Sequence, residues 1–206
     1  MPRRDDLKTI MVLGSGPIKI GQAAEFDFSG SQAVQALRED GYEVILVNSN
    51  PATIQNDPEM ADKIYIEPLI PDTVRRILEI EKPCALLAGM GGQTALNIAS
   101  ELAHDGSLER IGVELIGSDL DAIDKAEDRE LFNEVCDSIG LPISEAIACN
   151  TMEEVIAAAE EIGSWPILIR PAFTLGGLGG GTAWDIGQLV EIATLGLRNS
   201  RINQVL

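Results

Sequence analysis

Residues 9–22 read TIMVLGSGPIKIGQ, an apolar run that leads directly into a loop containing three glycines. Such a short apolar run is typical of a strand that is buried on both faces of a sheet. A helical pattern from about Ser29 to Asp40 follows, with Gly41 as its stop. Strand, glycine loop and helix together predict the first βα unit of an α/β fold.

The same alternation of apolar runs and amphipathic stretches continues to about residue 120. It predicts a helix that has Val74, Ile77 and Leu78 on one face and ends at Pro83. Another helix is predicted after the segment 89–94. The further predicted strands are Val44–Val47, Ile64–Ile66, Ala85–Ala88 and Glu114–Ile116. Residues 1–120 are therefore expected to form a Rossmann-like domain with a doubly wound parallel sheet.

A second unit is predicted over residues 121–206. It opens with a helix that stops at Gly140, and the capping box Thr151-Met152-Glu153-Glu154 begins a later helix. The remaining elements predicted here are strands at Ala146–Cys149 and Ile167–Arg170 and a helix at about Ile186–Leu197. Residues 204–206 resemble a strand that has only begun, so we expect the sequence to be truncated there.

The chain of 206 residues has a net charge of −18, from 33 acidic and 15 basic residues. This charge repels nucleic-acid phosphates and anionic membranes, so neither is an expected partner. No apolar run approaches 18 residues and no signal peptide is apparent, which predicts a cytoplasmic protein. Because the three cysteines are far apart in the sequence and there is one histidine, no zinc site is expected.

The glycines of the first loop are compatible with two roles. Glycine after a first strand can bring backbone N–H groups close to a phosphate at a helix N-terminus. The dinucleotide pattern, however, requires another glycine where Lys19 stands, and the second strand ends in Asn48 rather than in an acid. These departures argue against a dehydrogenase and leave a tight structural turn and a ligand site as equal alternatives.

The second unit holds a stronger signal, because Arg170 ends a predicted strand and a glycine-rich stretch follows it. Five glycines lie between Gly176 and Gly181, a conformational cost that an ordinary hairpin does not require. Such a loop can cover a triphosphate while the arginine supplies a fixed positive charge. The stretch lacks the Gly-Lys-Ser/Thr ending of a P-loop, so it indicates another nucleotide-binding architecture; the alternative is a flexible hairpin tip with a surface arginine.

Long ordered motifs of this chain resemble the large subunit of carbamoyl-phosphate synthetases over all 206 residues. The motifs are "GSGPIKIGQAAEFDFSGSQAVQALREDGYEVILVNSNPATIQNDPEMAD", "GGQTALN", "DAIDKAEDRELF" and "PILIRPAFTLGGLGGG". In that family the large subunit is duplicated, and "GPIKIGQ" is similar to the first half. The resemblance implies a pre-ATP-grasp domain over 1–120 and the beginning of an incomplete ATP-grasp domain over 121–206.

The resemblance also implies a function, that of an ATP-dependent carbon–nitrogen ligase of arginine and pyrimidine biosynthesis. The first half of such an enzyme phosphorylates bicarbonate to carboxyphosphate, and ammonia from a glutaminase small subunit then leads to carbamoyl phosphate. By motif match, Arg129, Arg170, Gly176 and Gly177 are expected to bind ATP. No catalytic residue is assigned within the 206 residues, and the ligands for Mg²⁺ or Mn²⁺ are expected downstream of Leu206, so this piece alone is expected to be inactive.

Two other functions remain as alternatives. One is a fragment of a different ATP-grasp ligase or carboxylase, such as biotin carboxylase, against which the motif "GPIKIGQAAEFDFSG" argues. The other is a non-catalytic binding module.

Overall fold

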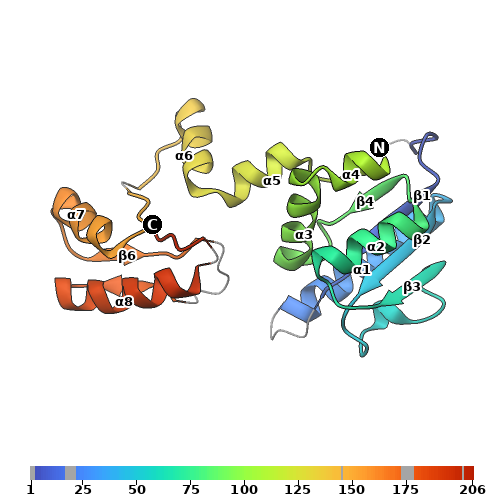
Figure 1. The fold of residues 1–206 in the computed structure, drawn as a ribbon, viewed down its shortest axis with the longest axis horizontal. Coiled ribbons are helices and arrows are strands. Elements are labelled where there is room, and N and C mark those ends of the chain that lie inside the picture. The colour runs from blue at the N-terminus through green and yellow to red at the C-terminus, as the bar shows by residue number, and fades with distance from the viewer. Residues whose placement is uncertain (1–2, 17–21, 145, 173–178, 201) are drawn as a thin grey trace. The chain divides into compact units, whose positions relative to one another are not determined.

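The computed structural model describes residues 3–16, 22–144, 146–172, 179–200 and 202–206 (Figure 1). Within these ranges the side chains of residues 22–25, 129 and 130 are not described. The chain divides into two compact units, Met1–Ile123 and Asp124–Leu206. In the described part, no helix has the length and apolar character that a bilayer crossing requires.

Unit 1 contains a parallel sheet of five strands in the order β3-β2-β1-β4-β5. The strands are β1 (Thr9–Leu13), β2 (Glu43–Asn48), β3 (Lys63–Ile66), β4 (Ala85–Leu87) and β5 (Glu114–Ile116). In register, Thr9 lies opposite Glu43 and Leu13 opposite Val47. The α/β class and the doubly wound parallel sheet are thus confirmed, with strand limits within one residue of the prediction.

The helices of unit 1 are α1 (Gln22–Glu39), the short 3₁₀ helix η1 (Ile54–Asn56), α2 (Pro71–Glu81), α3 (Gly92–His104) and α4 (Ser107–Ile111). A further helix, α5 (Leu120–Glu127), crosses the limit between the units. The prediction that the first helix begins at about Ser29 was wrong, because α1 starts at Gln22. Phe28 is 69% exposed, so this apolar residue does not mark a core-facing position that could have revealed this part of the helix.

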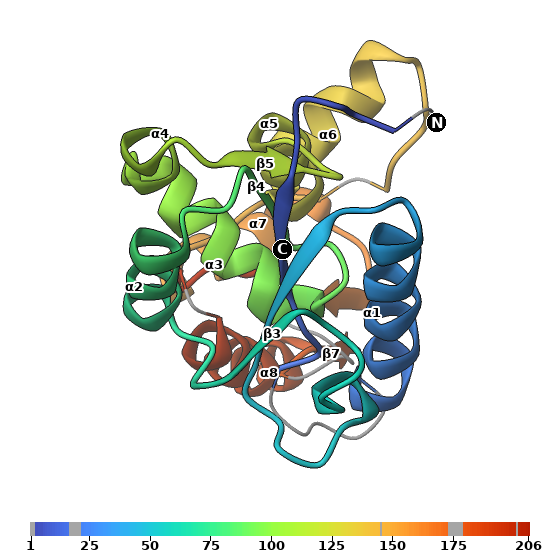
Figure 2. The same cartoon turned by 90° about the vertical axis from the view of Figure 1, so that its right-hand side faces the viewer.

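Side chains alternate along each strand, so each strand contributes residues to both faces of the five-stranded sheet. Helices cover both of these faces. Met11 and Leu13 of β1 belong to a core cluster that includes residues of α2 and α3. Ile10 and Val12 point to the opposite face and cluster with Val34 of α1. Figure 2 shows α1 and α2 on opposite sides of the strands. Unit 1 therefore has the layered α/β/α architecture that buried parallel strands require.

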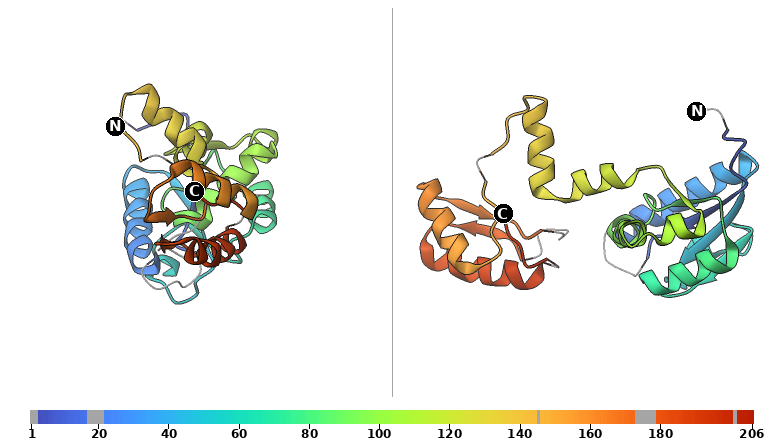
Figure 3. Two further views of the ribbon diagram at one scale, coloured as in Figure 1. Left: turned by 90° about the vertical axis from the view of Figure 1, so that its left-hand side faces the viewer. Right: turned by 45° about the horizontal axis from the view of Figure 1, so that its top comes forward.

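Unit 2 consists of a two-stranded antiparallel sheet with helices on one of its faces (Figure 3). Its elements are α6 (Arg129–Ser138), α7 (Met152–Ile162), β6 (Ile167–Ile169), β7 (Gly181–Ala183) and α8 (Ile186–Asn199). The capping box is confirmed, since the Thr151 side chain accepts from the Glu154 N–H and the Glu154 side chain reaches back to the Thr151 N–H. Val155 of α7 and Leu189 of α8 pack with Ile169 in one core cluster.

The predicted strand Ala146–Cys149 was wrong. Only Cys149 is paired, in a single antiparallel bridge with Val205, which also bridges Pro171. The apolar character expected of a strand is present at residues 146–148, but a strand also needs a neighbour with which to exchange backbone hydrogen bonds. The predicted strand ending at Arg170 is one residue shorter, and β7 was missed because its first residue, Gly181, belongs to the glycine-rich stretch.

Candidate functional site

The first glycine loop leaves β1 at the carboxyl edge of the sheet, where α/β proteins bind ligands. The Gly14 N–H donates to the Val47 carbonyl at 2.9 Å, and the Gly16 N–H donates to Asn48 Oδ1 at 3.0 Å. Asn48 is fully buried at the end of β2. The position at which a dinucleotide-binding protein holds an acid for ribose is therefore occupied by an amide that holds the loop itself.

A second buried amide, Gln55, packs between the loop and α1. Its Nε2 donates to the Phe26 carbonyl at 2.8 Å and to Asp27 Oδ1 at 3.4 Å. A methyl group at Gly14 would lie 2.6 Å from Gln55 Oε1, and one at Gly30 would lie 2.7 Å from Nε2. The two glycines thus make room for this amide. This role was not predicted from the sequence, although a glycine at position 30, inside a helix, could have signalled it.

The crevice between β1 and β4, where the strand order reverses, is closed by backbone. A methyl group at Gly91 would lie 2.5 Å from the Gly14 carbonyl oxygen and 2.8 Å from the Leu13 carbonyl oxygen. The loop after β4 therefore rests directly on the end of β1. Among the described residues, this contact and the buried amides favour the structural turn over a ligand site; residues 17–21 lie outside the described part.

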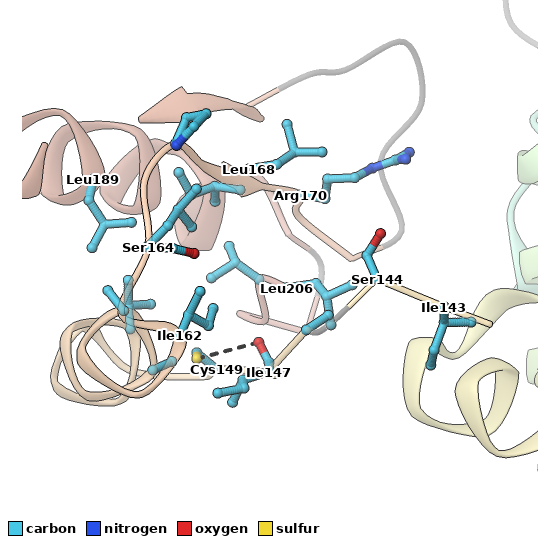
Figure 4. A pocket seen from close by; sticks show the side chains of 18 of the residues that line it. Ile143, Ser144, Ile147, Cys149, Ile162, Ser164, Leu168, Arg170, Leu189 and Leu206 are labelled. Atoms are coloured by element: carbon cyan, nitrogen blue, oxygen red, sulfur yellow. Dashed lines mark hydrogen bonds between the residues drawn. The ribbon is translucent and has the colours of Figure 1, made fainter. Parts of the chain in front are cut away.

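Arg170 lies directly after β6 and is exposed. Its backbone is fixed on one side, because its N–H donates to the Leu206 carbonyl at 2.9 Å and its carbonyl accepts from the Leu206 N–H at 2.8 Å. Its guanidinium points away from the apolar residues around Leu189 (Figure 4). Among the described residues it has no ion pair and no side-chain hydrogen bond. Unit 2 thus presents a positioned cation that is free to meet an anion.

The sequence of unit 2 contains few positive charges besides Arg170. The basic residues from 124 to 206 are Lys125, Arg129, Arg170, Arg198 and Arg201. Of the other residues predicted to bind ATP, Arg129 begins α6, but its side chain is not described, and Gly176 and Gly177 lie outside the described residues. The described residues therefore do not test whether the four predicted residues lie together, and their joint role stays a prediction.

The end of the glycine-rich stretch has a packing role. Gly179 has a φ of 73°, in the left-handed region that favours glycine, and a methyl group there would lie 2.9 Å from Asn199 Nδ2. Gly181 opens β7 and faces Ile192 of α8, 3.2 Å from where a methyl group would be. Contact with α8 therefore explains part of the glycine content that indicated a phosphate-binding loop.

A cavity of about 540 Å³ lies beside β6. Its lining is mainly apolar, with Ile162 of α7, Leu168 of β6 and Leu206 among its walls, and Arg170 also contributes to it (Figure 4). Cys149 lines the same cavity, and burial raises the pKa of its thiol. A neutral thiol with this surrounding is an apolar wall group rather than a nucleophile. In the described part of the chain, no cluster of three His, Cys, Asp or Glu side chains could hold a metal ion.

Two family matches cover nearly all of the chain. Residues 6–125 match the carbamoyl phosphate synthase preATP-grasp domain, and residues 128–206 match the ATP binding domain of the carbamoyl-phosphate synthase L chain. The chain belongs to the carbamoyl phosphate synthase large-chain family. Within this family, the Rossmann-like unit 1 corresponds to the preATP-grasp match, and Arg170 and β6 lie in the ATP-binding match.

Curated members of the carbamoyl phosphate synthase large-chain family are similar over all 206 residues. The large chain of Archaeoglobus fulgidus is 59% identical, and the chain spans 19% of its length. The N-terminal section of the large chain of Aquifex aeolicus is 56% identical, and the chain spans 37% of its length. The chain thus spans about a fifth to about two fifths of these relatives.

Solved structures that resemble the chain share its fold at low sequence identity. The biotin carboxylase domain of Hydrogenobacter thermophilus 2-oxoglutarate carboxylase has a TM-score of 0.72 at 19% identity, over 97% of this chain and 43% of that one. D-alanine–D-alanine ligase from Bacillus anthracis has a TM-score of 0.61 at 15% identity, over 96% of this chain and 55% of that one. The fold is therefore shared with these proteins. Their sequence identities of 19% and 15% are far below the 59% identity to the Archaeoglobus large chain.

Proposed function

We propose that the chain is the N-terminal part of a carbamoyl phosphate synthase large chain that uses ATP to phosphorylate bicarbonate. The product, carboxyphosphate, reacts with ammonia on the way to carbamoyl phosphate. The observation that carries this proposal is Arg170, an exposed guanidinium without an acidic partner among the described residues, placed at the end of β6 in the ATP-binding match.

The position of Arg170 suits the needs of phosphoryl transfer. The reaction needs positioning and stabilisation of negative charge more than covalent chemistry from the protein. The two backbone bonds to Leu206 fix the Cα of Arg170, so that the planar guanidinium has a defined reach. Leu168, two residues earlier on the same face of the strand, is 59% exposed and offers an apolar surface beside the charge. A nucleotide requires both kinds of surface.

The other parts of the proposal follow from family membership. Residues 1–120 form the preATP-grasp domain, and residues 121–206 begin the ATP-grasp domain. Arg129, Gly176 and Gly177 join Arg170 as ATP-binding residues. Mg²⁺ or Mn²⁺ accompanies ATP, with ligands from residues that follow Leu206 in the longer relatives.

Partners and location are part of the same proposal. Ammonia comes from a glutaminase small subunit, and the enzyme works in the cytoplasm in arginine and pyrimidine biosynthesis. The same fold accommodates comparable ligands elsewhere, since the Hydrogenobacter biotin carboxylase domain was solved in complex with MgADP and bicarbonate. The net charge of −18 makes a local cation such as Arg170 necessary for any anionic substrate.

The proposal is tested by measuring phosphate release from ATP. The protein used is a longer polypeptide that contains residues 1–206 and is as long as the curated relatives. Addition of bicarbonate is expected to stimulate hydrolysis, and ammonia is expected to yield carbamoyl phosphate. Hydrolysis that needs biotin or D-alanine instead of bicarbonate alone would assign the chain to another ligase.

A further inference from the structure

The residues that precede β1 lie at the amino end of the five-stranded sheet and contact elements on both sides of β1. The contact on the β2 side is made through Tyr42, which comes directly before β2 and is 8% exposed. The Arg4 N–H donates to Tyr42 Oη at 2.8 Å, and this hydroxyl donates to the Arg4 carbonyl at 3.3 Å. The backbone of Arg4 is therefore fixed to the element that leads into β2.

The side chain of Arg4 contacts the other side of β1, at β5. Its Nη1 donates to Glu114 Oε1 at 2.6 Å, and its Nη2 donates to Glu114 Oε2 at 2.9 Å. Asp6 also accepts from Arg4, from Nε at 3.2 Å and from Nη2. In the strand order β2-β1-β4-β5, Arg4 thus links elements that lie three strand spacings apart, about 14 Å.

The contact between Arg4 and β5 is electrostatic and accessible to solvent, since both side chains of the pair with Glu114 are 47% exposed. Isolated exposed ion pairs contribute little to stability, but a guanidinium that bonds to two carboxylates at once has the geometry that gives a measurable contribution. Hydrogen bonds from Arg4 also hold the pKa of Asp6 and that of Glu114 below their ordinary values. Screening by salt is expected to weaken such a contact.

β5 is short and lies at an edge of the sheet, so a contact at its first residue affects its pairing. It has three residues, and in the described part of the chain it pairs with β4 alone. The Glu114 N–H donates to the Cys84 carbonyl at 3.0 Å, at the same end of β5 that Arg4 contacts. Edge elements with few backbone hydrogen bonds open locally at free energies well below that of global unfolding.

We propose that residues 3–6 form an ionic strap that keeps β5 paired with β4 and that is released by dissolved salt. The chain passes from β5 into α5, which crosses the limit between the two units. Release of the strap therefore loosens the edge of the sheet from which the chain leaves unit 1. The strap contains none of the residues that are proposed to bind ATP, so it does not depend on the proposed function.

The neighbouring Arg3 offers a matched comparison, because it carries the same charge and has no ion pair with β5 among the described residues. Its guanidinium lies 5.3 Å from the centre of the Tyr42 ring and donates to the Gly41 carbonyl at 3.5 Å. In the described part of the chain it pairs with Asp5 alone, at 4.0 Å. Loss of Arg3 thus changes the net charge as much as loss of Arg4 does and leaves the strap's contact with β5 in place.

The test measures amide hydrogen exchange at Glu114 by NMR in dilute buffer. Arg4→Ala is expected to accelerate this exchange about fivefold, whereas Arg3→Ala is expected to change it by less than about twofold. The Cys84 N–H, which donates to the Thr9 carbonyl at 2.9 Å between β1 and β4, is expected to keep its exchange rate in both variants. Unchanged exchange at Glu114 in Arg4→Ala, or equal acceleration in Arg3→Ala, would overturn the proposal.

Salt gives an independent measurement, because screening weakens the strap while it relieves the self-repulsion of a chain with a net charge of −18. Between dilute buffer and about 1 M sodium chloride, exchange at Glu114 is expected to accelerate about threefold in the unaltered chain, whereas exchange at Cys84 is not expected to accelerate. In Arg4→Ala the acceleration at Glu114 is expected to be absent, since no ion pair between Arg4 and β5 is left to screen. Salt that slows exchange at Glu114 in the unaltered chain, or accelerates it equally in Arg4→Ala, would contradict the strap.

Discussion

Gly91 lies so close to Gly14 that a methyl group at position 91 would be 2.5 Å from the Gly14 carbonyl oxygen. The neighbouring atom belongs to backbone at the end of β1, so a side chain cannot be accommodated by a rotamer change. The loop after β4 and the loop after β1 are thereby held together at the centre of the sheet edge, the point at which many α/β proteins bind a ligand.

Gly91→Ala is therefore expected to destabilise unit 1 by roughly 2 kcal/mol or more, as overpacking against fixed atoms does. Urea denaturation gives the free energy of unfolding. Gly89→Ala is the matched control, because a methyl group at Gly89 has no atom within 4 Å, and it is expected to change stability by less than about 0.5 kcal/mol. Equal stability of the two variants would show that the two loops are not in contact.

Asp105, between α3 and α4, is expected to titrate at an unusually low pH. Hydrogen bonds from Ser107 and the nearby Arg75 lower the pKa of this carboxyl from 3.8 to about 2. Because the folded pKa is depressed, the stabilisation is present above about pH 4 and is lost as the pH falls towards 2. An NMR titration of the side chain measures the pKa directly.

Removal of the Ser107 hydroxyl provides the contrast for this titration. Ser107→Ala is expected to raise the pKa of Asp105, since the Ser107 side chain is the largest contributor to the shift. Ser138→Ala, in the other unit, is expected to leave it unchanged. An ordinary pKa for Asp105 in the unaltered chain would refute the predicted hydrogen bonding.

Salt is expected to stabilise the chain. With a net charge of −18, self-repulsion opposes the compact state at low ionic strength, and at 1 M salt the Debye length falls to about 3 Å, which screens it. The Tm is expected to rise between dilute buffer and about 1 M sodium chloride. An equal osmolality of sucrose separates screening from general solute effects, and a Tm that is flat or falls in sodium chloride contradicts the prediction.

The 206-residue chain by itself is expected not to turn over ATP, because the metal ligands of the family are expected after Leu206. The measurement is phosphate release with ATP, Mg²⁺ and bicarbonate. The longer polypeptide serves as the positive control. Sustained, bicarbonate-stimulated turnover by the 206-residue chain would show that its own residues complete the site.

The sequence was sufficient to predict the elements that repeat a simple pattern. Strands such as Thr9–Leu13 and Glu114–Ile116 are short apolar runs, and the capping box at Thr151 is a local signal, so each could be found without knowledge of the rest of the chain. The start of α1 was missed in a part of the helix where the apolar Phe28 is exposed and so does not mark a core-facing position.

Properties that depend on contacts distant in sequence could not be predicted. The strand expected at Ala146–Cys149 has the right composition, but its partner is Val205, more than fifty residues away, and only one residue pairs. The fit of Gln55 between Gly14 and Gly30 likewise depends on the packing of three segments. Of the candidate site, the place of Arg170 at a strand end was predicted, whereas its exposure and its guanidinium without an ion pair among the described residues became apparent only from the structure.

Arg170 is proposed to bind a phosphate of the ATP that activates bicarbonate. Loss of one charge-assisted contact in a water-excluded site costs on the order of 3 kcal/mol, or about a hundredfold in rate. Arg170→Lys is not expected to restore activity, because a single ammonium cannot reproduce the planar fork of guanidinium. Arg198→Ala, which removes an arginine from the last turn of α8 in the same unit, is the matched control and is expected to be neutral.

The decisive measurement is the pair of partial reactions of Arg170→Ala in the longer polypeptide. Bicarbonate-dependent ATP hydrolysis is expected to fall about a hundredfold. Synthesis of ATP from ADP and carbamoyl phosphate, which we expect the second half of the large chain to catalyse, is expected to persist. An equal fall in both reactions, or bicarbonate-dependent hydrolysis that survives the substitution, would contradict the assignment of Arg170 to the first ATP site.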